Sequence, residues 1–455
     1  MYSRPISSPV FSPVSRSRFT LPLLFSLMCA AVAPAQSVFD VSETNGNFNA
    51  NGTWVLLSGS GTRPTSGDQI AIISTNLTAN IEVAFPSDGT VASLVYGTAD
   101  EATDIARSIV FRGSGDVSHS LTITGDLTKY DSGTLTFRHR GSSGGELNLA
   151  IGGDVNLHAG TLNFGIDASG TRHLRNVSVG GSTQISGGTL NLRLLIDSSL
   201  GTLVLNGGTL NLNAGGVENT ETKTTFVRSL SGTGGTIGET TTGTGATFTL
   251  AITGEPDETS ATTHTWSGTI TDGSGTGSVA VKKSGVATQV LAGANTYEGG
   301  TIVDGGALVV SGSLASTGAV SVAANAAFVA AAMLEVGNLT LANEAILGFD
   351  LAQNASLKIN GDLDTTGMFT IDFRNTGEAG QLYTGLLTVT GTGADFGTVN
   401  FINFGSDGLA GQLTAGQLAG SFTIGAIPEP SHLAALLATV CGVVVFLIRR
   451  RRVRE

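Results

Sequence analysis

The sequence predicts an all-β body, built as a right-handed parallel β-helix or a closely related β-solenoid. Three observations support this fold class: glycine is very frequent, short turn-and-strand units recur, and apolar and polar residues alternate within the strands. The chain has 64 glycines in 455 residues without the three-residue period of collagen, and its 10 prolines are too few for a Pro-rich disordered protein. Because 40% of the residues are hydrophobic, the body can bury a long core.

Residues 1–35 have the layout of a secretory signal peptide. Basic residues precede an apolar run over residues 19–32, and Ala33 and Ala35 form the small-x-small pattern of a cleavage site before Gln36. The alternative is a first transmembrane helix, but the apolar run is short and no stop-transfer pattern follows it. We therefore expect export through the secretion translocon.

The body between the two end segments is acidic and has no cysteine. It carries 15 basic and 33 acidic residues, and both cysteines, Cys29 and Cys441, fall in the end segments. Such a surface repels phosphate, so nucleic acid is not an expected partner. Disulfides cannot stabilise this body, which must rely on hydrogen-bonded ladders and packing.

Residues 36–116 predict an N-terminal entry region. Short alternating segments such as residues 69–74 (QIAIIS) and 93–97 (SLVYG) are typical of strands, and the turn-rich segments around them suit a cap that shields the first coil.

The clearest repeats lie in residues 117–219. Units that begin at Gly125, Gly153 and Gly181 are 28 residues apart, and a Gly-Thr-Leu element recurs within them and once more after a shorter interval of 20 residues. Gly and Asp favour tight turns, and in residues 189–192 (TLNL) the leucines point to one face and Thr and Asn to the other. Strands this short gain a core only by stacking, which predicts a solenoid with Leu, Val and Ile inside.

Two alternatives remain open in this region. An array of β-sandwich domains is disfavoured because each unit is far shorter than the roughly 100 residues that a sandwich needs. Asn148, Asn163, Asn191 and Asn211 recur at matching strand positions. They form either an outward ligand-reading row or, as we prefer, ordinary solvent-facing or ladder asparagines.

The amino-acid composition changes twice in the C-terminal part of the body. Residues 220–280 are dominated by Thr and Gly, which predicts looser coils or a partly flexible spacer between two solenoid portions. Residues 281–426 return to short strands punctuated by glycine.

Residues 281–313 closely resemble the autotransporter-associated β-strand repeat. The central pattern Gly-x-Asn-Thr-Tyr-x-Gly-Gly-Thr spans residues 293–301, and the closing Gly-Gly-x-Leu spans residues 305–308. The opening Lys-x-Gly begins at Lys283 and departs from the family where Val-Ala replaces the usual Gly-Thr. The resemblance implies the β-helical stalk of a surface protein, and no long alternating strands of a membrane barrel follow it.

Residues 427–455 resemble the PEP-CTERM sorting signal of exported proteins in Gram-negative bacteria. The motif Pro428-Glu429-Pro430 and an apolar segment over residues 433–448 precede an arginine cluster, which consists of Arg449, Arg450, Arg451 and Arg452. The apolar segment predicts a single C-terminal transmembrane helix of about 24 Å, held at the cytoplasmic face by the arginines. The resemblance implies that an exosortase, a membrane-bound processing enzyme, recognises the Pro-Glu-Pro motif; the alternative is a permanent anchor.

No catalytic centre, metal site or cofactor site is predicted in the body. The six histidines lack metal-ligand spacing, and no nucleophile elbow or phosphate-cradling loop is present. Stacked coils would place one set of basic residues in a strip able to bind glycans: Arg138, His139, Arg140, Arg172, His173 and Arg175. We favour ordinary solvated charge, because acidic residues nearby nearly cancel the charge of this strip.

These observations predict an exported, non-enzymatic, structural or adhesin-like protein. The C-terminal helix would anchor it transiently before display at the cell surface, in the outer membrane or in the extracellular matrix. The family resemblances imply an association with exopolysaccharide or biofilm. The alternative is a β-helical polysaccharide lyase or glycoside hydrolase that uses the basic strip on acidic polysaccharides.

Overall fold

The computed structural model describes residues 36–424, except 43–45, 74–79, 100–106, 115–116, 141–144, 166–173, 194–196, 213–222, 241–244, 376 and 379. Strands dominate these residues; the helices among them are α1 (Ala415–Ala419) and the 3-10 turns η1 (Asn51–Thr53) and η3 (Leu351–Gln353). Within this described part, no helix has the length and apolar character needed to cross a membrane. The expected signal peptide and C-terminal transmembrane helix lie outside the described residues.

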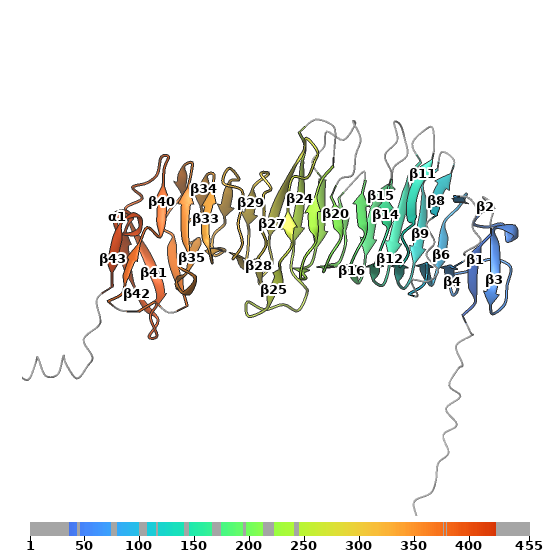
Figure 1. The fold of residues 1–455 in the computed structure, drawn as a ribbon, viewed down its shortest axis with the longest axis horizontal. Helices are drawn as coiled ribbons and strands as arrows, with labels where there is room; N and C mark the ends of the chain where they lie inside the picture. The colour runs from blue at the N-terminus through green and yellow to red at the C-terminus, as the bar shows by residue number, and fades with distance from the viewer. Residues whose placement is uncertain are drawn as a thin grey trace, which may run out of the picture. The chain divides into compact units, whose positions relative to one another are not determined.

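Successive strands join three sheets in rotation, so that along the N-terminal half every third strand belongs to the same sheet (Figure 1). Sheet A contains β1 (Val38–Val41), β3 (Trp54–Ser58), β4 (Gln69–Ile72), β7 (Ser93–Tyr96), β10 (Leu127–Lys129), β13 (Val155–Leu157), β16 (Ser182–Ile185), β19 (Thr202–Leu205) and β22 (Leu230–Ser231). Sheet B contains β2 (Gly46–Asn47), β5 (Ile81–Phe85), β8 (Ser108–Ser114), β11 (Thr134–Arg140), β14 (Thr161–Phe164), β17 (Thr189–Leu192), β20 (Thr209–Asn211), β23 (Thr236–Gly238) and β26 (Thr269–Ile270).

Sheet C runs through both halves of the body. It contains β6 (Gly89–Val91), β9 (His119–Ile123), β12 (Leu147–Ile151), β15 (Leu174–Val179), β18 (Ser198–Ser199), β21 (Lys223–Val227), β24 (Thr247–Ile252), β27 (Ser278–Lys283), β29 (Thr301–Val303), β31 (Val320–Val322), β34 (Leu339–Leu341) and β37 (Leu363–Thr365).

Two further sheets accompany sheet C in the C-terminal half. Sheet D contains β25 (Thr263–Trp266), β28 (Thr288–Leu291), β30 (Ala307–Val310), β32 (Ala327–Ala330), β35 (Ile346–Asp350), β38 (Thr370–Arg374), β41 (Thr398–Phe404) and β42 (Leu409–Thr414). Sheet E contains β33 (Met333–Val336), β36 (Ser356–Ile359) and β40 (Leu387–Val389). A small pair, β39 (Leu382–Thr384) and β43 (Ser421–Thr423), completes the C-terminal end.

The strand pairs within the described coils are parallel, and the antiparallel ones lie at the two ends of the stack, between β1 and β3, β41 and β42, and β39 and β43. Each turn of the chain thus lays new strands beside those of the previous turn, which is the topology of a β-helix. The prediction of an all-β solenoid is confirmed. The alternative of a β-sandwich array is wrong, because sandwiches are built from antiparallel sheets.

The ladder registers reproduce the repeat intervals read from the sequence. In sheet B, Thr161 pairs with Thr189, 28 residues later, and Thr189 pairs with Thr209, 20 residues later. The glycines that open the repeats also stack, since Gly153 N–H donates to the carbonyl of Gly125 at 2.9 Å and Gly181 N–H to that of Gly153 at 3.0 Å.

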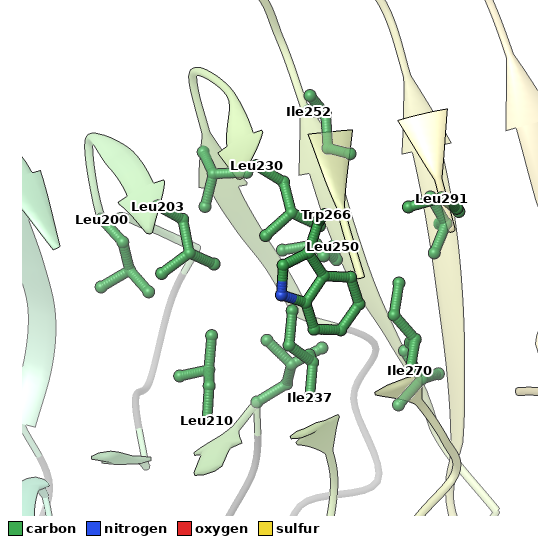
Figure 2. Packing of buried hydrophobic residues seen from close by; sticks show 14 of the residues in the cluster. Leu200, Leu203, Leu210, Leu230, Ile237, Leu250, Ile252, Trp266, Ile270 and Leu291 are labelled. Atoms are coloured by element: carbon green, nitrogen blue, oxygen red, sulfur yellow. The ribbon is translucent and has the colours of Figure 1, made fainter. Parts of the chain in front are cut away.

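Inward-facing side chains form one hydrophobic core that extends from Phe39 to Phe422. Figure 2 shows its middle section, where Trp266 lies among Leu230, Ile237 and other aliphatic side chains. The Trp266 ring is fully buried, and its Nε1–H donates to the carbonyl of Gly234 at 3.2 Å. The ring leaves no room for a side chain at residue 268: a Cβ on that glycine would lie 2.3 Å from Trp266 Cζ2.

The stack has a joint where sheet A ends and sheet D begins. A parallel bridge between Gly232 and Trp266 links β22, the last strand of sheet A, to β25, the first strand of sheet D. The described parts of residues 220–280 supply β21 to β27, and β21 and β24 pair with neighbours on both sides in sheet C. These parts of the Thr/Gly-rich segment therefore continue the coils.

Candidate functional site

The residues of the predicted sorting signal, from Pro428 to Arg452, lie outside the described residues. The same holds for Ala33 and Ala35 of the predicted cleavage site, while Gln36 is the first described residue and precedes β1. The sorting and processing sites therefore remain predictions from the sequence.

The described members of the basic strip do not share one sheet. Arg138 and His139 lie on β11 in sheet B, whereas Arg175 lies on β15 in sheet C. Arg172 and His173 lie outside the described residues, and the side chain of Arg140 does too.

His139 does not belong to any surface strip, which corrects the prediction made from the sequence. Side chains alternate along β11, so Leu135, Phe137 and His139 point inward and are fully buried, while Arg138 points outward. Burial lowers the pKa of His139 and favours the neutral imidazole. Added Cβ atoms at Gly113 or Gly145 would come within 2.5 or 2.6 Å of this ring, so the coil is closed tightly around it.

The two described arginines of the strip are paired with acidic side chains. Arg138 Nη2 lies 3.2 Å from Glu82 Oε2, and Glu82 also pairs with Arg112. Arg175 Nη1 pairs with Glu146, and its side chain is 47% exposed. The paired carboxylates neutralise the positive charge that would be needed to attract an anionic glycan.

Three of the four recurring asparagines form a hydrogen-bonded ladder. Asn191 Nδ2 donates to Asn163 Oδ1 at 2.8 Å, and Asn211 Nδ2 donates to Asn191 Oδ1 at 2.6 Å. Asn148 is separate, because it lies in sheet C opposite Ser120 and Asn176. The preference for ladder asparagines over a ligand-reading row is confirmed for the three in sheet B.

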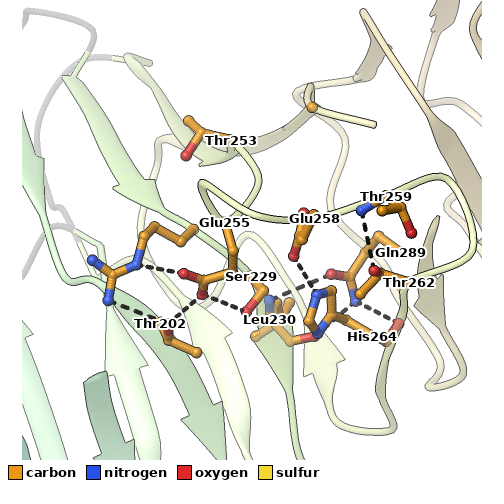
Figure 3. A network of polar contacts seen from close by, with 12 residues as sticks. Thr202, Ser229, Leu230, Thr253, Glu255, Glu258, Thr259, Thr262, His264 and Gln289 are labelled. Atoms are coloured by element: carbon orange, nitrogen blue, oxygen red, sulfur yellow. Dashed lines mark hydrogen bonds and ion pairs between the residues drawn. The ribbon is translucent and has the colours of Figure 1, made fainter. Parts of the chain in front are cut away.

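A polar network closes the joint between sheets A and D (Figure 3). Arg228 Nε lies 2.8 Å from Glu255 Oε2, and Ser229 Oγ donates to Glu255 Oε1 at 3.2 Å. The buried amide of Gln289 imitates a strand backbone: Nε2 donates to the carbonyl of Leu230 at 2.8 Å, and Oε1 accepts from Leu230 N–H at 3.4 Å. The Gln289 amide thus satisfies the backbone N–H and carbonyl of Leu230 at the point where one sheet replaces another.

The outer face of sheet D carries a groove of about 650 Å³. Its floor follows one outward row of the ladder, in which Val290, Val309 and Val329 stand opposite one another on β28, β30 and β32. Gly348 is the next member of this row, and a Cβ there would come within 2.8 Å of the Val329 side chain. We call this hollow the sheet D groove.

The C-terminal end of the sheet D groove is polar. Arg374 Nε donates to Asp372 Oδ2 at 2.7 Å, and Asn403 Nδ2 donates to Asp372 Oδ1 at 2.8 Å. Asn375 Nδ2 donates to Asp350 Oδ2 at 2.7 Å. Asn375 and Asn403 have φ values of 51° and 60°, in the left-handed region that asparagine tolerates better than most residues.

Sequence reasoning missed this groove. The sequence does carry a signal for it. Val occupies an outward-facing position in "ALVV" (307–310) and in "AFVA" (327–330), whereas strands of the N-terminal coils have Thr or Asn at their outward-facing positions. The described residues contain no group of three or more His, Cys, Asp or Glu side chains suited to a metal ion.

The residues of the 281–313 repeat have structural tasks in the coil. The Asn295 side chain is buried: Oδ1 accepts from Ile270 N–H at 3.0 Å and Nδ2 donates to the carbonyl of Gly293 at 2.9 Å. Tyr297 is buried too, with its hydroxyl 2.8 Å from Thr301 Oγ1, and burial raises its pKa. These side chains hold the corner that leads into β29.

One comparison with known proteins found a match, and it lies within this repeat. Residues 281–310 match the family model described as the passenger-associated-transport-repeat. No curated protein matches the chain, and no solved structure does. The matched repeat and the parallel sheets on both sides of it support a surface-exposed or secreted, passenger-like β-helical protein.

Proposed function

We propose that this chain is an exported, non-enzymatic structural or adhesin-like protein of the bacterial surface or extracellular matrix, associated with exopolysaccharide. The signal peptide at residues 1–35 delivers it across the inner membrane, and an exosortase processes it at Pro428-Glu429-Pro430. The alternative activity, that of a lyase or hydrolase on acidic polysaccharide, is the competing outcome of the test below.

The continuity of the coils around the matched repeat carries this proposal. Sheet C runs through the passenger-type repeat from β24 to β31 without a change of partner order. Each coil offers its outer faces to solvent and its inner faces to one shared core. Such a body presents a long repetitive surface and needs no disulfide, which suits a stalk or an adhesive scaffold.

Charge supports a partner other than an anionic polymer. The body between the end segments carries 33 acidic against 15 basic residues. The described arginines of the predicted strip are already paired with Glu82 and Glu146. An association with acidic polysaccharide would therefore start from unfavourable long-range electrostatics.

The test follows the full-length chain in a Gram-negative host that encodes an exosortase. Mass spectrometry of the protein from each cell fraction should show an N-terminus at Gln36 and a C-terminus shortened near Pro428. The triple variant Pro428→Ala, Glu429→Ala, Pro430→Ala should keep its tail and remain in the membrane fraction, while Glu455→Ala should behave as the unmodified chain. An intact N-terminus in the cytoplasmic fraction would refute export.

The enzyme alternative is tested on the same purified chain. Incubation with acidic polysaccharides should release no uronic-acid product. Product release that Arg138→Ala abolishes would replace the structural proposal with the lyase or hydrolase.

A further inference from the structure

We infer that the sheet D groove is a binding site for a neutral oligosaccharide. This inference deepens the proposed function and depends on it, because it names the site and the class of glycan that a surface-exposed scaffold would hold. It rests on three features of the groove: an apolar floor, a hydrogen-bonding end and a charge balance that disfavours anions.

The floor of the groove matches the C–H faces of sugar rings. Val290, Val309 and Val329 form an aliphatic row across three adjacent strands, with Gly348 next in line. Val290 and Val309 are the partly exposed members of this row, while Val329 is buried beneath the surface of the groove. From β28 to β41 the sheet advances by five strand spacings of about 4.8 Å, or roughly 24 Å. That span and the volume of about 650 Å³ suit a short chain of sugars.

The polar end supplies both donors and acceptors. Arg374 uses Nε for Asp372, so the N–H groups of its two terminal nitrogens can donate to a ligand, and its side chain is 34% exposed. Asn375 and Asn403 use their Nδ2 groups on Asp350 and Asp372, so their Oδ1 atoms remain as acceptors. Hydroxyl groups of a sugar can donate to these oxygens and accept from the guanidinium.

The charge at the polar end of the groove favours a neutral ligand over an anionic one. Asp350 and Asp372 place two carboxylates beside the single guanidinium of Arg374, so the polar end has a net negative charge. A uronic acid would meet like charge there. An extended peptide is a poor occupant because the backbone groups of sheet D are already paired in its ladders, which leaves the peptide backbone without partners.

Binding is measured on the purified full-length chain by isothermal titration calorimetry. Maltohexaose, cellohexaose and mannohexaose are the neutral probes, and a galacturonic-acid hexamer is the anionic probe. We expect at least one neutral hexasaccharide to bind and the anionic hexamer to bind more weakly. Arg374→Ala should weaken neutral binding at least about tenfold through the lost charged hydrogen bonds, and Val309→Glu should do the same by placing a charge on the floor.

Matched variants separate the groove from the rest of the surface. Arg175→Ala removes an arginine that is also paired with a carboxylate, but on sheet C, and should leave the affinity unchanged. If Arg374→Ala does not fold, Asn403→Gly replaces it, because glycine accepts the φ of 60° without strain.

Three results would overturn the inference: no binding of any neutral probe, tighter binding of the anionic hexamer, or an affinity that ignores both groove variants. Failure of the proposed function looks different, because it appears as cytoplasmic retention of the unmodified chain in the fractionation experiment.

Discussion

Lys283 provides a prediction about stability that can be worked out in numbers. Its side chain is buried at the end of β27, where Nζ donates to the carbonyls of Ser284 at 2.6 Å, Gly285 at 3.1 Å and Gly305 at 3.3 Å. Burial lowers the pKa of Lys283 from its ordinary value of 10.5 to about 8, against the opposing attraction of Glu258. The folded protein therefore releases this proton at a lower pH than the unfolded chain does.

The sign of the effect follows from proton binding. Between about pH 8 and pH 10.5 the unfolded chain holds more protons on Lys283, so the free energy of unfolding rises with pH across this window. This contribution to stability is complete above pH 10.5 and is lost as the pH falls through 8. Since one pKa unit corresponds to about 1.36 kcal/mol, the full rise is about 3 kcal/mol.

The assay is urea unfolding of the full-length chain and of Lys283→Met at several pH values across the window. The difference in unfolding free energy between the two proteins should grow by about 3 kcal/mol in favour of the unmodified chain. Lys282→Met is the control for loss of a lysine from the same strand, because Lys282 is 42% exposed and pairs with Asp304. A difference that stays constant with pH would refute the reasoning.

Two substitutions test the core and the asparagine ladder by urea unfolding. Trp266→Ala should lower the free energy of unfolding by about 3–5 kcal/mol, because it empties a fully buried site and leaves the carbonyl of Gly234 without its donor. Trp266→Phe should cost less, and equal losses for the two variants would contradict the packing argument. Asn191→Ala should cost about 1–3 kcal/mol because it removes two side-chain hydrogen bonds. Asn148→Ala is the matched control outside the ladder, and an equal loss there would show that the ladder has no special role.

The repeats were predictable because they are local patterns. Gly125, Gly153 and Gly181 mark the turns, and the alternation of Leu and Asn in "TLNL" specifies which side chains face the core. A parallel ladder at these intervals is the arrangement that buries all the leucine rows together, so the fold class followed from sequence alone.

The candidate site was not predictable in the same way. The inward position of His139 follows from the alternation of Leu135 and Phe137 along β11, but the arginines on either side of His139 favoured a solvent-facing basic strip. The sheet D groove needs β28, β30, β32 and β38 in one register, although these strands are separated by unequal numbers of residues.

The amino-acid sequence by itself determined that this chain forms stacked coils, where the turns fall and which residues fill the interior, because turn chemistry and side-chain alternation act over a few residues. The tertiary structure decided which outward residues meet across neighbouring coils. Asp350, Asp372 and Asn403 lie on successive coils and converge only once the ladder is in register. Hydrogen bonds between distant segments set that convergence, and no local pattern encodes it.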